Sequence, residues 1–294
     1  MEIISIGTDH PVAGIRANLV QEVESLHGYG VVARFRQSDL GHHSFLHCYL
    51  EENGPENGEG RNRVFRYYLA NAITDLILNV ISREMLRRLL TRDYGCFTDE
   101  EREEILREAI AFLEEPANPA FTPPRIIRRD RILVRVLRYL EEHDRLILEG
   151  FVRFQLQDFY TELKEAADRA VERFLARREY DEFIRLLRYL VEIQPARLEE
   201  LNVRVEQDGI FALLDEEGRP VEHEQLRNLL IETTEEEIEY GDLLLSALVT
   251  IAPAKVILHI REPFPVLETI SRVFGPRMLI CPGCPLCPPG VRAP

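Results

Sequence analysis

The sequence predicts an α+β protein in which a mostly helical middle is flanked by an α/β segment at each end. Apolar residues recur every three or four positions through residues 64–193, which is typical of amphipathic helices. Before and after this stretch they form short runs bounded by turn residues, which is typical of strands. With 45% hydrophobic and 30% charged residues, the 294-residue chain has the composition of a folded protein with a packed core.

The N-terminal α/β segment, residues 1–52, is predicted to have a β-α-β-β order. Its expected elements are a strand at residues 1–7, a helix at 11–26, and strands at 31–35 and 45–50. Residues 53–63 are rich in Gly, Asn and Glu and carry no apolar anchor. We therefore expect a flexible linker and a domain boundary there.

The helical region, residues 64–195, is predicted to contain five helical segments, most of them separated by breaks that contain Pro or Gly. They are expected at about residues 65–90, 98–115, 126–148, 151–175 and 183–193. Thr98 followed by Glu101 resembles a capping box, in which two side chains bond the free backbone N–H groups at a helix start. The apolar stripe of the 151–175 segment is expected to face the core rather than a ligand.

The C-terminal α/β region, residues 196–287, is predicted to hold a β-hairpin and a β-α-β unit. Asp208 and Gly209 lie between two alternating runs, which indicates a hairpin turn. The later elements are expected as a helix at about 235–250, a strand at 255–260, a helix at 265–274 and a strand at 277–280. The two α/β regions could share one sheet. Residues 288–294 are expected to form a disordered tail.

Charge and composition disfavour several function classes. The formal net charge of −15 opposes non-specific binding to nucleic acid or to an anionic membrane. No apolar run in the sequence is long enough to span a membrane, and the first residues lack the pattern of a signal peptide. Five cysteines, three of them in one short run, suit a reducing compartment better than a disulfide framework. The sequence therefore predicts a cytoplasmic protein.

Four stretches in the second half of the chain carry a resemblance to a known family. They are EGFVRFQLQDFYTEL (149–163), EYDEFIRLLRYLVEIQ (179–194), GDLLLSALVTIAPAKVILH (241–259) and FGPRMLICPGCPLC (274–287). In these stretches the chain resembles the YtxC-like family of endospore-forming bacteria, whereas the first 120 residues match only in overall pattern. The resemblance implies a setting in sporulation. It supplies no catalytic residues, because the family's activity is uncharacterised.

The sharpest local motif is Cys281-Pro-Gly-Cys284-Pro-Leu-Cys287, directly after a predicted strand. Two-residue spacing lets successive thiolates reach one ion, so the motif indicates a zinc or iron–sulfur site. Such sites normally have four protein ligands. The candidates for the fourth are Cys48, Cys96, a histidine such as His259, and a residue of another subunit. Redox-active or simply reduced thiols are the alternatives.

Two other metal or redox interpretations are less favoured. A thioredoxin-like site needs a helix after its cysteines, and Pro285, Pro288 and Pro289 block one here. Three histidines, His42, His43 and His47, lie near Cys48. On a strand, the second and third of them would stand about 13 Å apart and could not clamp one ion.

An arginine stripe is predicted on the helix at residues 126–148. Its members are Arg128, Arg131, Arg135 and Arg138. Such a stripe could contact an acidic protein partner, or it could pair with the chain's own acidic residues. The negative net charge favours internal pairing.

Motif analysis favours an interaction protein over an enzyme. The sequence contains no G-x-G-x-x-G, P-loop, G-x-S-x-G or H-E-x-x-H motif. The leading hypothesis is a sporulation-associated protein that acts through contacts with an unidentified protein partner, without nucleic acid or a membrane span. A metal- or cluster-binding protein centred on the three C-terminal cysteines is the second hypothesis. An enzyme of unrecognised class is the third.

Overall fold

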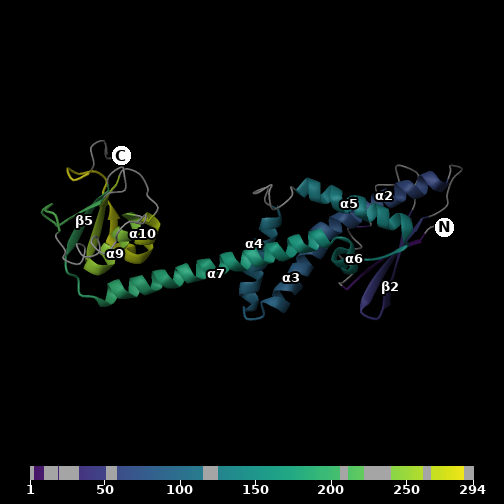
Figure 1. Ribbon diagram of the computed structural model, residues 1–294, viewed down its shortest axis with the longest axis horizontal. Helices are drawn as coiled ribbons and strands as arrows, with labels where there is room; N and C mark the ends of the chain where they lie inside the picture. Colours follow the sequence, from purple (N-terminus) through teal and green to yellow (C-terminus); the bar gives the residue numbers. More distant parts are fainter. Residues whose placement is uncertain are drawn as a thin grey trace. The chain divides into compact units, whose positions relative to one another are not determined.

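A computed structural model of the chain describes residues 3–9, 19, 33–50, 58–114, 125–205, 211–221, 240–260 and 266–287. The chain divides into two compact units, residues 1–175 and 176–294, each with its own sheet and hydrophobic core (Figure 1). Helix α7 (Gln157–Ile193) contributes residues to both units. The predicted α+β class is confirmed.

The sheet of unit 1 has the strand order β2-β3-β1-β4. Its strands are β1 (Ile3–Thr8), β2 (Ala33–Leu40), β3 (His43–Leu50) and β4 (Arg145–Ile147). β3 pairs antiparallel with both β1 and β2, and β4 pairs with β1 in parallel. Sequence analysis had placed β4 inside a helix. Three residues show no period of their own, and pairing with β1 decides their conformation.

The helices of unit 1 coincide with the predicted helical segments, with two exceptions. The segment expected at 151–175 is divided at Leu156 between α6 (Leu148–Gln155) and α7. The break expected at residues 176–182 is absent, because that stretch contains no Pro or Gly to end α7.

The helical elements of unit 1 are α2 (Gly58–Leu76), the π-helical turn η2 (Ile77–Ile81), α3 (Ser82–Asp93), α4 (Asp99–Glu114), α5 (Arg125–Glu142), α6 and the first part of α7. α2 begins at Gly58, so residues 58–63, expected as linker, are helical. The rest of the linker, and the helix expected at residues 11–26 apart from the buried helical Leu19, lie outside the described residues.

The predicted capping box opens α4. The Thr98 hydroxyl accepts the backbone N–H of Glu101 at 3.2 Å, and the Glu101 carboxylate accepts the backbone N–H of Thr98 at 2.8 Å. The apolar stripe of α6 and α7 faces the core, as predicted; its buried members include Val152, Phe159 and Leu163. Both signals are local in sequence, which is why they could be recognised without a structure.

The sheet of unit 2 has the strand order β6-β5-β7-β8. Its strands are β5 (Glu200–Val205), β6 (Phe211–Leu214), β7 (Lys255–His259) and β8 (Met278–Ile280), and its helical elements after α7 are α9 (Tyr240–Ile251), α10 (Leu267–Phe274) and η3 (Gly275–Arg277). β5 and β6 form the predicted hairpin, whose turn lies outside the described residues. β7, α10 and β8 form the predicted parallel β-α-β unit.

The two α/β regions do not share a sheet, contrary to the possibility raised from the sequence. β4 occupies the edge of β1 that faces away from β3, so the first sheet is completed by a strand from the helical region. The expected tail at residues 288–294 lies outside the described residues. Among the described helices, none combines the length and the apolar character that a membrane crossing requires.

Candidate metal centre

The C-terminal cysteine motif begins where β8 ends, beside the last residue of β7. Ile280 of β8 is paired with Leu258 of β7, and the backbone N–H of Cys281 donates to the carbonyl of Leu258 at 2.9 Å. Because the two strands are parallel, both leave the sheet at the same edge. Their first side chains beyond this pair, those of His259 and Cys281, therefore meet there.

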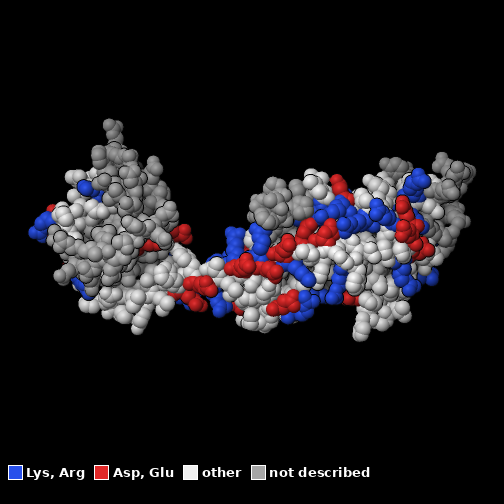
Figure 2. All heavy atoms as spheres, viewed as in Figure 1, with Lys and Arg blue, Asp and Glu red and all other residues white. Residues whose placement is uncertain are grey.

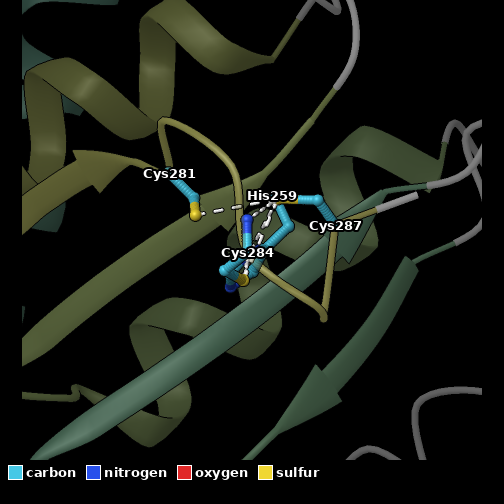
Figure 3. A group of neighbouring side chains, drawn as sticks. All are labelled: His259, Cys281, Cys284 and Cys287. Carbon is cyan, nitrogen blue, oxygen red and sulfur yellow. Dashed lines mark hydrogen bonds between the residues drawn. The ribbon is translucent and has the colours of Figure 1, made fainter. Parts of the chain in front are cut away.

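Four potential ligand atoms converge at this edge. Sγ of Cys287 lies 3.7 Å from Sγ of Cys281 and 4.0 Å from Sγ of Cys284. Nδ1 of His259 lies 3.4 Å from the sulfurs of both Cys284 and Cys287 (Figure 3). All four ligand atoms lie within 4.8 Å of one another. Sulfurs at the corners of a tetrahedron around zinc, with Zn–S bonds near 2.3 Å, would be about 3.8 Å apart. The observed spacing is close to that of a tetrahedral site.

The loop that carries the cysteines turns its backbone N–H groups toward the sulfurs. The N–H of Cys284 donates to Sγ of Cys287 at 3.4 Å, and the N–H of Leu286 donates to Sγ of Cys284 at 3.3 Å. Gly283 has a φ of 138°, a backbone conformation that L side chains rarely adopt. The Pro-Gly pair in the motif therefore allows the turn that brings Cys284 back toward Cys281.

The ionisation of these groups is shifted in directions relevant to metal binding. Burial raises the pKa of the Cys281 thiol to about 11. The pKa of Cys284 is lowered: burial opposes ionisation, but hydrogen bonds from the Leu286 N–H and the neighbouring thiols outweigh it. Burial lowers the pKa of His259, so its imidazole is neutral at neutral pH. A neutral imidazole is the form that binds a metal ion.

A buried amide fixes the orientation of the histidine ring. The side-chain amide nitrogen of Asn202 lies 3.2 Å from the Asp215 carbonyl and 3.3 Å from the Glu200 carboxylate, and both of these groups only accept hydrogen bonds. Its Oδ1, 2.9 Å from Nε2 of His259, is therefore the acceptor of that contact. Nε2 then carries the proton, and Nδ1 presents its lone pair to the three sulfurs. Such second-layer contacts commonly orient metal-binding histidines.

Of the four candidates for the fourth ligand, the structure brings His259 to the three cysteines. Cys48 and Cys96 belong to unit 1 and are not members of the group. Cys48 is buried in the apolar core, which raises its pKa to about 12, and Cys96 is exposed. Asn202 carried no sequence signal of its own, because a single Asn on a short strand is unremarkable until its strand is known to lie next to the histidine.

Two of the three histidines near Cys48, His43 and His47, have polar partners other than one another. His47 lies between two hydroxyls, with Nδ1 2.8 Å from Ser5 Oγ and Nε2 2.7 Å from Ser38 Oγ. His43 contacts the Asp9 carboxylate. These two side chains share one face of β3, as the alternation along a strand predicts.

The arginine stripe of α5 packs largely against acidic residues of α7. Arg128 is buried and its Nε donates to Glu162 at 2.8 Å. Arg131 pairs with Asp158 at 3.0 Å and also contacts Glu162, and Arg135 pairs with Asp158 at 2.6 Å. Figure 2 shows basic and acidic side chains lying next to one another over this unit. Three of the four arginines thus take part in internal ion pairs.

Arg138, the last member of the stripe, differs from the other three. It is exposed, and no ion pair involving it occurs within the described parts of the chain. A role for the stripe as a contact surface for an acidic partner stays a prediction.

Comparison with known proteins places the chain in a family. The model of the YtxC-like family matches residues 67–279, which covers most of both units and ends two residues before Cys281. The chain is similar to a protein of Bacillus subtilis (strain 168) named "Uncharacterized protein YtxC", with 29% identity over 203 residues, 68% of this chain and 71% of the relative. No solved structure matches. On the extent of the family match, the chain belongs to the YtxC-like family.

Proposed function

We propose that unit 2 is a zinc-binding module in which Cys281, Cys284, Cys287 and His259 hold one Zn²⁺ ion. The observation that carries this proposal is the near-tetrahedral spacing of the four ligand atoms, all within 4.8 Å of one another. The donor set favours zinc over an iron–sulfur cluster. Three thiolates and one imidazole form a common structural zinc site. Iron–sulfur clusters normally take four thiolates, or two thiolates on one iron and two imidazoles on the other.

The ion would have a structural role. Four protein ligands complete a tetrahedral shell, so no position is left for a water molecule or a substrate. β8 is the edge strand of its sheet and has only three residues, two of them exposed. Zinc would tie the segment that follows β8 to the end of β7 and so keep the short strand paired. Three reduced thiols in one site fit a cytoplasmic location.

Metal analysis of the purified full-length chain tests the zinc proposal. We expect one zinc ion per chain after purification without added metal, and an absorption band of tetrahedral thiolate coordination after replacement of zinc by cobalt. Cys284→Ser and His259→Gln should each lower the zinc content and alter the cobalt spectrum. Iron with a coloured protein would instead indicate a cluster, and metal-free protein that fails to take up zinc or cobalt would refute the site.

Cys96→Ser is the matched control for the metal analysis. This cysteine is exposed and lies in unit 1, so its removal takes away one thiol without touching the proposed ligands. The Cys96→Ser protein should retain one zinc ion per chain. A loss of zinc in this control as well would show that the metal binds to thiols without regard to the geometry of the site.

The second part of the proposal concerns sporulation and rests on the family and on one surface of α7. Phe183, Leu186, Leu190 and Ile193 are between 42% and 63% exposed and follow one another at spacings of three, four and three. A neighbouring face of the same helix stretch, which carries Ile184, Leu187 and Val191, packs into the core of unit 2. The 3-4-3 spacing is that of a helix that pairs with another helix.

The occupant we propose for this stripe is a helix of a different sporulation protein. The stripe covers little more than one heptad, whereas self-sustaining coiled coils need at least about three. A stable homodimer generally buries a much larger apolar area. The stripe therefore fits a transient contact with another protein better than a permanent pairing with a second copy.

Charge insertion into the stripe tests this contact. Leu186→Glu with Leu190→Glu should reduce sporulation several-fold in a spore-forming host that depends on the protein, while the purified protein stays folded, zinc-loaded and monomeric. Glu192→Lys, an exposed change on the same helix, is the control and should leave sporulation unchanged. Unchanged sporulation in the double variant would refute the contact. A wild-type dimer that the double variant dissociates would identify a second copy as the occupant and refute the proposed partner.

A further inference from the structure

We propose that unit 1 binds a nucleoside phosphate in a cavity at the carboxyl ends of β1 and β4. The cavity has a volume of about 880 Å³ and lies wholly within unit 1. Cavities of roughly 300 to 1,000 Å³ are typical of small-molecule sites. The proposal is independent of the zinc site, which lies in unit 2.

The position of the cavity follows from the parallel pairing of β1 with β4. Asp9 comes directly after β1, and Glu149 lies in the first turn of α6, directly after β4. Both residues line the cavity, together with Gly150. The carboxyl ends of parallel strands are where open α/β sheets bind ligands. The first turn of α6 adds backbone N–H groups that the helix itself does not use.

The acidic side chains of the cavity are already engaged. Asp9 contacts the guanidinium of Arg88 at 3.3 Å and the imidazole of His43. Glu149 accepts the hydroxyl of Thr8 at 2.7 Å and the backbone N–H of Asp9 at 3.2 Å. Asp9 therefore has two basic partners, and one oxygen of Glu149 has two hydrogen-bond donors.

The basic side chains outnumber the acidic ones, and two of them lack a carboxylate partner. Arg88, Arg92, Arg145 and Arg153 line the cavity. In the described parts of the chain, no carboxylate oxygen lies within ion-pair distance of Arg145 or Arg153. Both guanidinium groups lie over aromatic rings: that of Arg145 is 5.5 Å from the Phe45 ring centroid, and that of Arg153 is 5.9 Å from the Phe154 ring centroid.

The cavity has more arginines than carboxylates, although the chain as a whole has a net charge of −15. This local excess of positive charge favours an anionic ligand. Guanidinium groups bind phosphate oxygens through paired hydrogen bonds, and they remain charged at every physiological pH. A phosphate group bound by these arginines would supply the counter-charge that the described protein groups do not provide. Arg145 and Arg153 are therefore expected to bind the phosphate part of the ligand.

The rest of the cavity is suited to a flat ring. Tyr139, Phe151, Phe154 and Tyr160 contribute aromatic lining. Phe154 is 66% exposed, which leaves a large apolar ring without a cover. Stacking of a nucleobase on such a ring removes apolar surface from water. Inorganic phosphate alone would fill only a small part of the volume. A nucleoside phosphate is the class of ligand that carries both a phosphate group and a flat ring.

Calorimetric titration of the full-length protein as purified tests the proposal. The probes are AMP, ADP, GDP and CDP, with adenosine and pyrophosphate as probes that carry only the ring or only the phosphates. At least one nucleotide should bind with Kd below about 1 mM, and both partial probes should bind at least about tenfold more weakly. The absence of binding by all four nucleotides would overturn the proposal, and pyrophosphate binding as tight as that of the nucleotides would overturn the role of the ring.

Variants then locate the site. Arg145→Gln and Arg153→Gln should each weaken the best nucleotide at least about tenfold, because each removes a charged hydrogen-bond donor. Phe154→Ser, at an exposed position, should also weaken it without affecting the fold. Arg138→Gln, an exposed arginine of the same unit outside the cavity, is the matched control and should bind like the wild type. Equal loss in Arg138→Gln, or wild-type binding in both arginine variants, would place binding elsewhere and overturn the assignment.

Discussion

Unit 1 and unit 2 each pack a four-stranded mixed sheet against helices, but they complete their structures differently. The core of unit 1 joins residues from three strands and from every helix of that unit, so its sheet is held by extensive apolar burial. The core of unit 2 is smaller, and its edge strand β8 has three residues. At the end of that strand lie three thiols and a buried imidazole. Under the zinc proposal, unit 2 relies on a metal ion where unit 1 relies on its core.

Metal removal should therefore lower the stability of unit 2 and leave that of unit 1 unchanged. Chelation of zinc from the full-length protein should cost unit 2 about 4 kcal/mol or more of stability, because an ion held far above its dissociation constant stabilises only the folded form. Unit 1, with no proposed ligand, should be unaffected. Hydrogen exchange read by mass spectrometry measures both units in one sample. Protection should fall in β7 and β8 and remain in β1 and β3.

Two results would contradict this picture. Equal loss of protection in both units would mean that they unfold together, and unchanged protection in unit 2 would mean that its core is sufficient without metal. Cys96→Ser serves as the reference, since its exchange before and after chelation should match that of the wild type.

The largest effect expected from a single substitution in unit 1 concerns its buried ion pair. Arg128 and Glu162 are 3% and 12% exposed at the side chain and lie 2.8 Å apart. Arg128→Met should lower the free energy of unfolding by about 3 kcal/mol, because a largely buried carboxylate loses the more buried of its two arginine partners. Urea denaturation measures the change. Addition of Glu162→Leu to this variant should recover part of the loss, and a single-variant effect below about 0.5 kcal/mol would show that Arg131 compensates Glu162.

Features with a local sequence signal could be predicted, whereas features that depend on strand pairing or on residues far apart in the chain could not. Most helices, the capping box at Thr98 and Glu101, and the C-terminal β-α-β unit have local signals and were predicted, but the unbroken run of α7 through residues 176–182 was not. β4 was missed because only its pairing with β1 makes three residues a strand. The cysteine spacing indicated a metal site, but the choice of His259 over other ligands depends on the parallel pairing of β7 with β8, which no local pattern reports. The cavity of unit 1 gathers residues from strands and helices far apart in sequence, so it had no sequence signal at all.

The contact between Asn202 and His259 should have a measurable effect on zinc affinity. Asn202→Ala removes the acceptor at 2.9 Å from Nε2 that fixes the ring and its tautomer. We expect zinc affinity to fall by about 10- to 100-fold while the four ligands still bind one ion, as is usual when a second-layer partner is lost. Competition with a chromogenic chelator measures the change. Asn202→Asp, which restores an acceptor, should recover much of the affinity, and equal affinity in Asn202→Ala and the wild type would show that the strand pairing alone positions the ring.

The smallest expected effect lies in the exposed part of the arginine stripe. Arg131 and Arg135 are 32% and 40% exposed at the side chain and share the Asp158 carboxylate. Half-exposed ion pairs are screened by solvent and gain little over hydrated charges, so Arg131→Ala and Arg135→Ala should each lower stability by less than about 1 kcal/mol. Arg138→Ala, without an ion pair in the described chain, should stay within about 0.5 kcal/mol of the wild type by the same urea denaturation. Losses above about 2 kcal/mol for either paired arginine would show that charge pairing, and not only apolar burial, holds α5 against α7. In that case unit 1 would depend on its polar groups as unit 2 is proposed to do, and the difference between the two units would be one of degree.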